Sequence, residues 1–197
     1  MRNFARSIVL LLALGLSGPV LAGPLEDANA AYQKQDYTAA LRLFRPLADQ
    51  GDADAQTMLG FMYQHGLGVP QDYAQAVKWY RLAADRGYAR AQDFLGFMYD
   101  TGFGVSRDYA QAVQWYRLAA DQANPSAQFH LGLMYEHGLG VPLDSVEAHK
   151  WFNLAAAGAS DADTRKRAAK ARDDRAWMMT PAQIAEAQKR ASAWQPK

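Results

Sequence analysis

Residues 53–88 read ADAQTMLGFMYQHGLGVPQDYAQAVKWYRLAADRGY, and residues 89–124 read ARAQDFLGFMYDTGFGVSRDYAQAVQWYRLAADQAN. The two stretches are identical at 24 of 36 positions, and residues 125–160 form a third copy with 19 identities to the first. Similarity at a fixed period of this length is typical of a solenoid, in which each unit buries its apolar face only against its neighbours. Such arrays present extended surfaces, so the repeat favours a binding protein over an enzyme.

Each unit contains two helical patterns separated by a glycine-rich connection. In the first copy, Ala55, Leu59 and Met62 recur at the spacing of one helix face, and residues 73–84 carry a second such stripe. Two glycines and a proline in residues 65–70 end the first helix and reverse the chain. Aspartates precede the second helix of all three copies at the N-cap position: Asp72, Asp108 and Asp144. The sequence therefore predicts one helix pair per unit.

The motif LGxMYxxGxGV followed by DYxxAxxWYxxAA, which spans residues 53–160, resembles the Sel-one-like repeat family, relatives of the tetratricopeptide repeats. Residues 23–52 resemble an incomplete amino-terminal unit of the same kind, without the GLGV loop. The resemblance implies an all-α fold, a right-handed α-solenoid of antiparallel helix pairs, with repeats at 53–88, 89–124 and 125–160.

The repeat period fails after residue 160. Ser160 with Asp163 predicts one further helix start, and Thr180 with Gln183 predicts a capping box before another. Solenoids need terminal elements that shield their last open face. We therefore expect residues 161–197 to form C-terminal capping helices.

Residues 1–22 have the organisation of a secretory signal peptide. Arg2 and Arg6 precede the apolar run at 8–16, and small side chains lead up to Ala22. The apolar run is shorter than the roughly 20 residues of a membrane span, which argues against an uncleaved anchor. Cleavage after Ala22 by the general export route of a bacterium, and a periplasmic or secreted protein with no stable membrane span, are the expectations. The chain has no cysteine, so its stability depends on packing alone.

Composition and motifs exclude several classes of function. The formal net charge of +1 and the absence of clustered basic charge argue against nucleic-acid binding. The chain has no GxSxG, phosphate-loop or HExxH motif. His130 and His137 are seven residues apart on one expected helix, about 10 Å, which is too far for one metal ion. We expect no catalytic residues, no metal and no cofactor.

A tryptophan begins an aromatic pair in each second helix, at positions 79, 115 and 151. A ladder of this kind could stack on sugars or aromatic ligands. At helical spacing it more commonly forms the seam between successive helix pairs, and the interpretation adopted here is core packing.

One set of first-helix residues points away from the expected core. Positions two residues beyond the buried face lie roughly 200° from it, and in tetratricopeptide-like arrays the first helices line the concave surface. We expect a protein or peptide to bind there, although these side chains could instead fill space between neighbouring first helices. The predicted partner-binding residues are Thr57, Phe61, Gln64, Asp93, Phe97, Asp100, Phe129, Leu133 and Glu136.

Three functional hypotheses follow. The first is an exported, non-enzymatic adaptor or scaffold that binds a protein or a peptide segment with basic flanks in its concave groove. The second is recognition of peptidoglycan or a small ligand, which the resemblance raises through the penicillin-binding and weak β-lactamase activities of cysteine-rich relatives; this chain lacks their cysteines. The third is a structural or effector-like role at a host surface, which no residue supports.

Overall fold

The computed structural model describes residues 23–197, which form ten α-helices and no strand. The predicted signal peptide, residues 1–22, lies outside the described residues. The helices are α1 (Pro24–Gln33), α2 (Tyr37–Asp49), α3 (Ala53–His65), α4 (Tyr73–Ala84), α5 (Ala89–Thr101), α6 (Tyr109–Asp121), α7 (Pro125–His137), α8 (Ser145–Gly158), α9 (Ala162–Ala176) and α10 (Pro181–Ala193).

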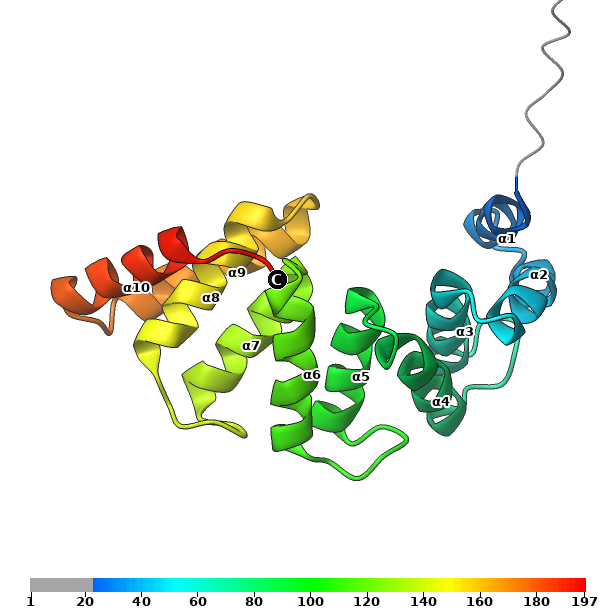
Figure 1. The fold of residues 1–197 in the computed structure, drawn as a ribbon, viewed down its shortest axis with the longest axis horizontal. Coiled ribbons are helices and arrows are strands. Elements are labelled where there is room, and N and C mark those ends of the chain that lie inside the picture. Colours follow the sequence, from blue (N-terminus) through cyan, green and yellow to red (C-terminus); the bar gives the residue numbers. More distant parts are fainter. Residues whose placement is uncertain (1–22) are drawn as a thin grey trace, which may run out of the picture.

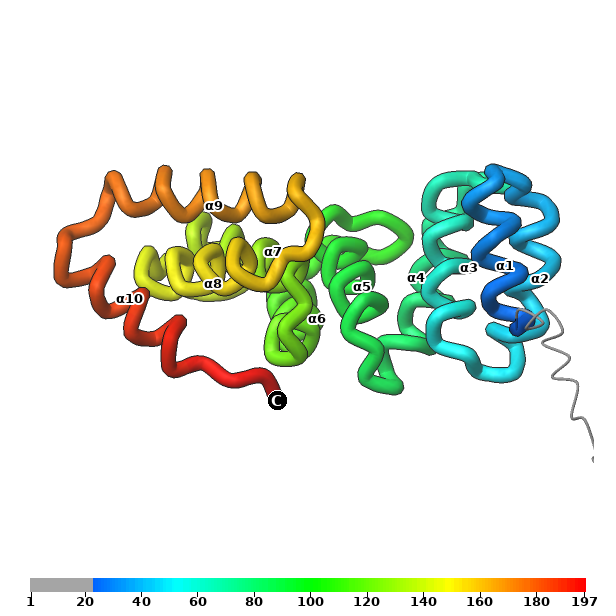
Figure 2. Tube along the Cα trace, turned by 90° about the horizontal axis from the view of Figure 1, so that it is seen from above, coloured from blue at the N-terminus to red at the C-terminus, as the bar shows by residue number. Residues whose placement is uncertain are grey.

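The helices follow one another along a curved array, with α1 and α2 at one end and α9 and α10 at the other (Figures 1 and 2). From α1 to α9, each helix packs against the next one in the chain. The three sequence repeats coincide with the pairs α3–α4, α5–α6 and α7–α8. The all-helical solenoid of helix pairs predicted from the repeat is confirmed.

Short polar side chains start the helices where the sequence predicts them. The carboxylates of Asp72 and Asp108 accept hydrogen bonds from the backbone N–H groups three residues later, and Asp144 accepts from those of Val146 and Glu147. Asn124 caps α7 in the same way, and Thr180 forms a complete capping box with Gln183 at α10. Each cap satisfies an N–H that the helix itself leaves without an acceptor, which is worth about 1 kcal/mol.

The glycine-rich connections also join one repeat to the previous one. Gly104, in the loop of the second full repeat, has φ +72°, and a Cβ there would lie 2.4 Å from the backbone oxygen of Tyr73 at the start of α4. Gly68 and Gly140 make the corresponding contacts one repeat earlier and later. Only glycine permits both this backbone conformation and this close approach.

The repeated tryptophans belong to the core. Trp79 and Trp151 are buried in apolar clusters, and the half-buried Trp115 packs against a third cluster. Trp79 joins the cluster that contains Phe44 of the preceding helix pair. This arrangement confirms the tryptophans as the seam between successive units.

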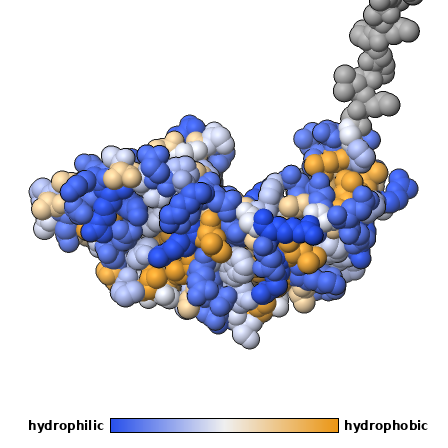
Figure 3. Space-filling view, in the orientation of Figure 1, coloured by the Kyte–Doolittle hydropathy of each residue, from blue (hydrophilic) through white to orange (hydrophobic). Residues whose placement is uncertain are grey.

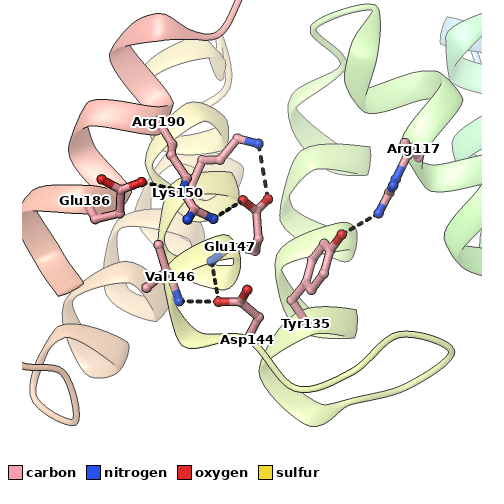
Figure 4. Close-up of polar contacts among 8 residues, drawn as sticks. All are labelled: Arg117, Tyr135, Asp144, Val146, Glu147, Lys150, Glu186 and Arg190. Atoms are coloured by element: carbon pink, nitrogen blue, oxygen red, sulfur yellow. Dashed lines mark hydrogen bonds and ion pairs between the residues drawn. The ribbon is translucent and has the colours of Figure 1, made fainter.

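The last two helices end the array by covering α8. Both α9 and α10 pack against α8, and the Trp194 ring meets Trp151 edge-on at 6.3 Å. Arg190 of α10 donates to Glu147 at the start of α8 at 2.9 Å (Figure 4). Ser160 does not cap α9, because Asp161 occupies the cap and accepts from the Thr164 N–H at 2.7 Å. The predicted helix start is therefore displaced by one residue.

The surface in the view of Figure 3 is mostly hydrophilic, with an apolar patch near the α1–α2 end. Across residues 23–197, every helix is too short or too polar to cross a lipid bilayer.

Candidate functional site

Three of the nine predicted partner-binding residues lie inside the array. Thr57 is buried and its hydroxyl donates to the Ala53 carbonyl one turn earlier, at 2.7 Å. Asp93 and Phe129 occupy the equivalent positions on α5 and α7 and are also buried. These three side chains lie beneath the surface, where little of their area is accessible to a partner. The helical-wheel argument missed this because residues of other helices lie over these positions: His130 of α7 contacts Asp93, and Phe152 of α8 packs against Phe129.

The predicted apolar row, Phe61, Phe97 and Leu133, is half-buried. The Phe61 ring lies 6.0 Å from Phe94 of the next repeat, and Phe97 packs against the core clusters on both sides of α5. Leu133 packs against the cluster that contains Phe129. These side chains therefore fill space between first helices and also expose part of their surface.

The remaining three predicted residues are Gln64, Asp100 and Glu136. They form a polar row, with one residue at the end of each first helix. The hydroxyl of Tyr80 donates to Gln64 Oε1 at 2.7 Å, and that of Tyr116 donates to Asp100 at 3.5 Å. Glu136 accepts from the guanidinium of Arg175 on α9, with 3.0 Å between Nε and Oε1. Each member of the row thus has an intramolecular partner.

A hollow of about 320 Å³ opens where α3, α5, α7 and α9 meet. It contains three of the predicted residues, one from α3 and two from α5. Four further residues complete it, and we call the surface they share the first-helix hollow. Its lining residues are Gln64, Asp93, Phe94, Phe97, Ser126, His130 and Arg167.

The floor of the first-helix hollow is an Asp–His pair. His130 Nδ1 lies 2.8 Å from Asp93 Oδ1, and the His130 ring packs at 4.9 Å on the ring of Tyr116. A carboxylate only accepts hydrogen bonds, so His130 carries its proton on Nδ1. The contact ties α5 to α7, and within residues 23–197 His130 Nε2 makes no hydrogen bond.

Two tyrosines behind the floor are neutral hydrogen-bond donors. Burial raises the pKa of Tyr80, and burial together with the nearby Asp93 and Asp100 carboxylates raises that of Tyr116. Burial also raises the pKa of the Asp100 carboxyl, against the lowering effect of His130 and the Tyr116 hydroxyl. These tyrosines therefore keep their protons throughout the physiological range and hold their acceptors in place.

Arg167 forms the α9 side of the hollow. Its guanidinium lies 4.9 Å from the centre of the Phe129 ring and 3.9 Å from Asp163. The repeat pattern could not reveal this residue, because α9 lies beyond the last repeat. Nor could it reveal His130, since the equivalent positions in the earlier repeats are Met58 and Phe94.

The hollow offers polar donors beside phenyl rings, an arrangement suited to binding a segment of another molecule. Within residues 23–197, no group of three or more histidine, aspartate or glutamate side chains is placed to hold a metal ion.

Comparison with known proteins agrees with this architecture. The family model of the Sel1 repeat matches residues 29–52, 53–88, 89–124 and 125–160. No curated protein matches the chain significantly.

Two solved structures share the fold. The crystal structure of c5321, a protective antigen of uropathogenic Escherichia coli strains that displays an SLR fold, is 43% identical over 72% of this chain and 31% of that one, with a TM-score of 0.66. A Sel1 repeat protein from Oxalobacter formigenes is 32% identical over 75% of this chain and 57% of that one, with a TM-score of 0.68. The chain thus spans less than two thirds of either relative. Because four repeats match the family model and two solved Sel1 repeat structures are similar, the chain belongs to the Sel1 repeat family.

Proposed function

We propose that this protein is a non-enzymatic adaptor that binds another protein through the first-helix hollow and the half-buried rings beside it. Proteins built from Sel1 repeats generally mediate protein–protein interactions on a non-catalytic scaffold. The observation that carries the proposal for this chain is the hollow itself, because four helices from different units converge on it and contribute both polar and aromatic side chains to its lining. Concave sites with a few convergent polar groups among apolar ones are typical binding sites.

A steric block of the hollow tests this proposal. Ser126 lines the hollow at the start of α7, and a tyrosine in its place would fill part of the volume. We expect Ser126→Tyr to lose the partner that co-purifies with the wild-type protein from its own cells. Ser192→Tyr, at an exposed position of α10, is the matched control and should retain it. Equal recovery by both variants, with unchanged helicity, would place the binding surface elsewhere.

We also propose that residues 1–22 are removed and that the mature protein acts in the periplasm or outside the cell. The support is the sequence alone: two arginines, an apolar run and small residues before Gly23. Amino-terminal sequencing of the protein from its native host should start at Gly23. A protein that retains Met1 in the cytoplasmic fraction would contradict this proposal.

A further inference from the structure

We propose that the first-helix hollow takes an acidic side chain of a partner peptide, with an apolar side chain of the same peptide against Phe94 and Phe97. The inference rests on the proposed function and specifies the chemistry of the partner at that site. Its basis is the set of polar groups that line the hollow. The one carboxylate among them, Asp93, is engaged by His130, while the Arg167 guanidinium and the Gln64 amide remain for a ligand.

Gln64 faces the hollow with a donor. The hydroxyl of the buried Tyr80 donates to Gln64 Oε1 at 2.7 Å. An amide group has one oxygen acceptor and one NH₂ donor. With the oxygen engaged by Tyr80, the Gln64 Nε2 group remains to donate to a ligand.

The acidic group of the hollow is already used. Asp93 is buried and accepts from His130 Nδ1 at 2.8 Å, so its charge is directed toward the histidine. His130 Nε2 is the nitrogen left for a ligand, and it donates only when both ring nitrogens carry a proton. The Asp93–His130 contact therefore fixes the ring and leaves Nε2 at the hollow.

The remaining two polar residues also favour an anion. Ser126 is the second residue of α7, where the helix dipole attracts negative charge, although Asn124 already accepts from the Ala127 and Gln128 N–H groups. Arg167 contributes a guanidinium whose ion pair with Asp163 is loose, at 3.9 Å, and exposed to solvent. A carboxylate would complete charge-assisted hydrogen bonds with these donors.

Two other carboxylates near the hollow have intramolecular partners. Asp100 accepts from Tyr116, and Glu136 pairs with Arg175 at the α7–α9 contact. Asp163 lies 3.9 Å from Arg167 in an exposed ion pair. The sequence suggested a partner with basic flanks because acids recur along this row; the partner segment proposed at the hollow is acidic instead, because these acids already have partners.

Short defined peptides test the inference. The probes are acetyl-Leu-Glu-Leu-amide and its Leu-Gln-Leu and Leu-Lys-Leu counterparts. Each is added to the protein of residues 23–197, and binding is followed by the shifts of backbone amide signals in NMR spectra. We expect the glutamate peptide to shift the amides of Ser126 and His130 at concentrations where the other two do not. Arg167→Gln should weaken this binding about tenfold, the effect of one charge-assisted contact.

Lys166→Gln is the matched control, because it removes the same charge from an exposed neighbouring position of α9 that does not line the hollow. Equal weakening by both variants, stronger binding of the lysine peptide, or no shift at the hollow with any peptide would overturn the inference. A partner lost by Ser126→Tyr but indifferent to Arg167→Gln would leave the adaptor function in place and refute only the acidic chemistry.

Discussion

The ring of Tyr116 lies directly over Gly96, so that a Cβ atom at Gly96 would come within 2.7 Å of Tyr116 Cδ1. The same relationship joins Gly60 to Tyr80 and Gly132 to Phe152 in the neighbouring repeats. Each of these rings is fully buried. In each unit, the aromatic ring of the second helix therefore packs directly on the backbone of the first helix, at a glycine that has no side chain. From this position Tyr116 also contacts Asp100 and His130, which lie near the hollow.

Gly96→Ala should therefore destabilise the array even though alanine is the better helix former by about 1 kcal/mol. Overpacking a well-packed core costs about 1–3 kcal/mol, and the Tyr116 ring that would have to move is fully buried. The midpoint of urea unfolding measures the change. Gly158→Ala is the control, because a Cβ at that position meets its nearest atom at an ordinary 3.7 Å. Equal midpoints for the Gly96 variant and the wild type would disprove the close-contact role.

Ala123 has φ +60°, where the two preceding units have Gly51 and Gly87 with positive φ. Alanine in this left-handed conformation costs about 1 kcal/mol, part of which the greater freedom of glycine in the unfolded chain offsets. We expect Ala123→Gly to raise the free energy of unfolding by ~0.5 kcal/mol. Ala74→Gly, in a regular turn of α4, should lower it by about 1 kcal/mol. A loss of stability at both positions would show that no strain is relieved at Ala123.

The Glu136–Arg175 pair holds α9 against α7. Both side chains are largely buried, with 16% and 14% of their surfaces exposed. Removing one member leaves the other charge in a poorly solvated place, so Arg175→Gln should cost ~2–3 kcal/mol. The double variant Glu136→Gln/Arg175→Gln should lose less than the sum of the single losses. Lys170→Gln, from an exposed pair with Asp174, should change stability by less than about 0.5 kcal/mol. Additive losses at Glu136 and Arg175 would contradict the coupling.

His149 makes the stability of the last repeat depend on pH. It is buried at the position where the two preceding repeats have Val77 and Val113, and its Nδ1 has no hydrogen-bond partner within residues 23–197. Burial, followed by the nearby Arg172, lowers the pKa of His149 from its ordinary value. As the pH falls below about 6.5, the unfolded chain therefore takes up this proton before the folded one does, and stability decreases until the lowered pKa is passed.

His149→Val should remove this contribution to the loss of stability between neutral and acidic pH, as measured by unfolding midpoints at a series of pH values. His137→Gln is the control because His137 is exposed. An unchanged pH dependence in the His149 variant would show that other groups are responsible.

The repeat period predicts the fold well because each unit repeats the same physical solution. The caps at Asp72, Asp108 and Asp144 and the buried glycine contacts are local and recur at a fixed spacing, so they can be found in the sequence. The packing of α10 on α8 depends on Trp194 and Arg190, which have no counterpart in the repeats. Periodicity therefore cannot predict it.

The hollow was predictable only in part, and for a similar reason. Helical geometry places Gln64 and Phe97 on one face of the first helices, and both residues line the hollow. The Asp93–His130 pair joins residues 37 positions apart that differ from their equivalents in the other repeats. Its formation requires the relative position of two helices, which a single sequence pattern does not contain.

The most direct test of the adaptor function is site-specific photo-crosslinking in the native host. A photoreactive phenylalanine analogue at Phe97 lies beside the first-helix hollow, and the same analogue at Leu118, an exposed position of α6, is the control. The account predicts one dominant protein adduct from position 97, absent from position 118 and lost when Ser126→Tyr is introduced. An adduct from position 118 alone, or the same adducts from both positions, would contradict it.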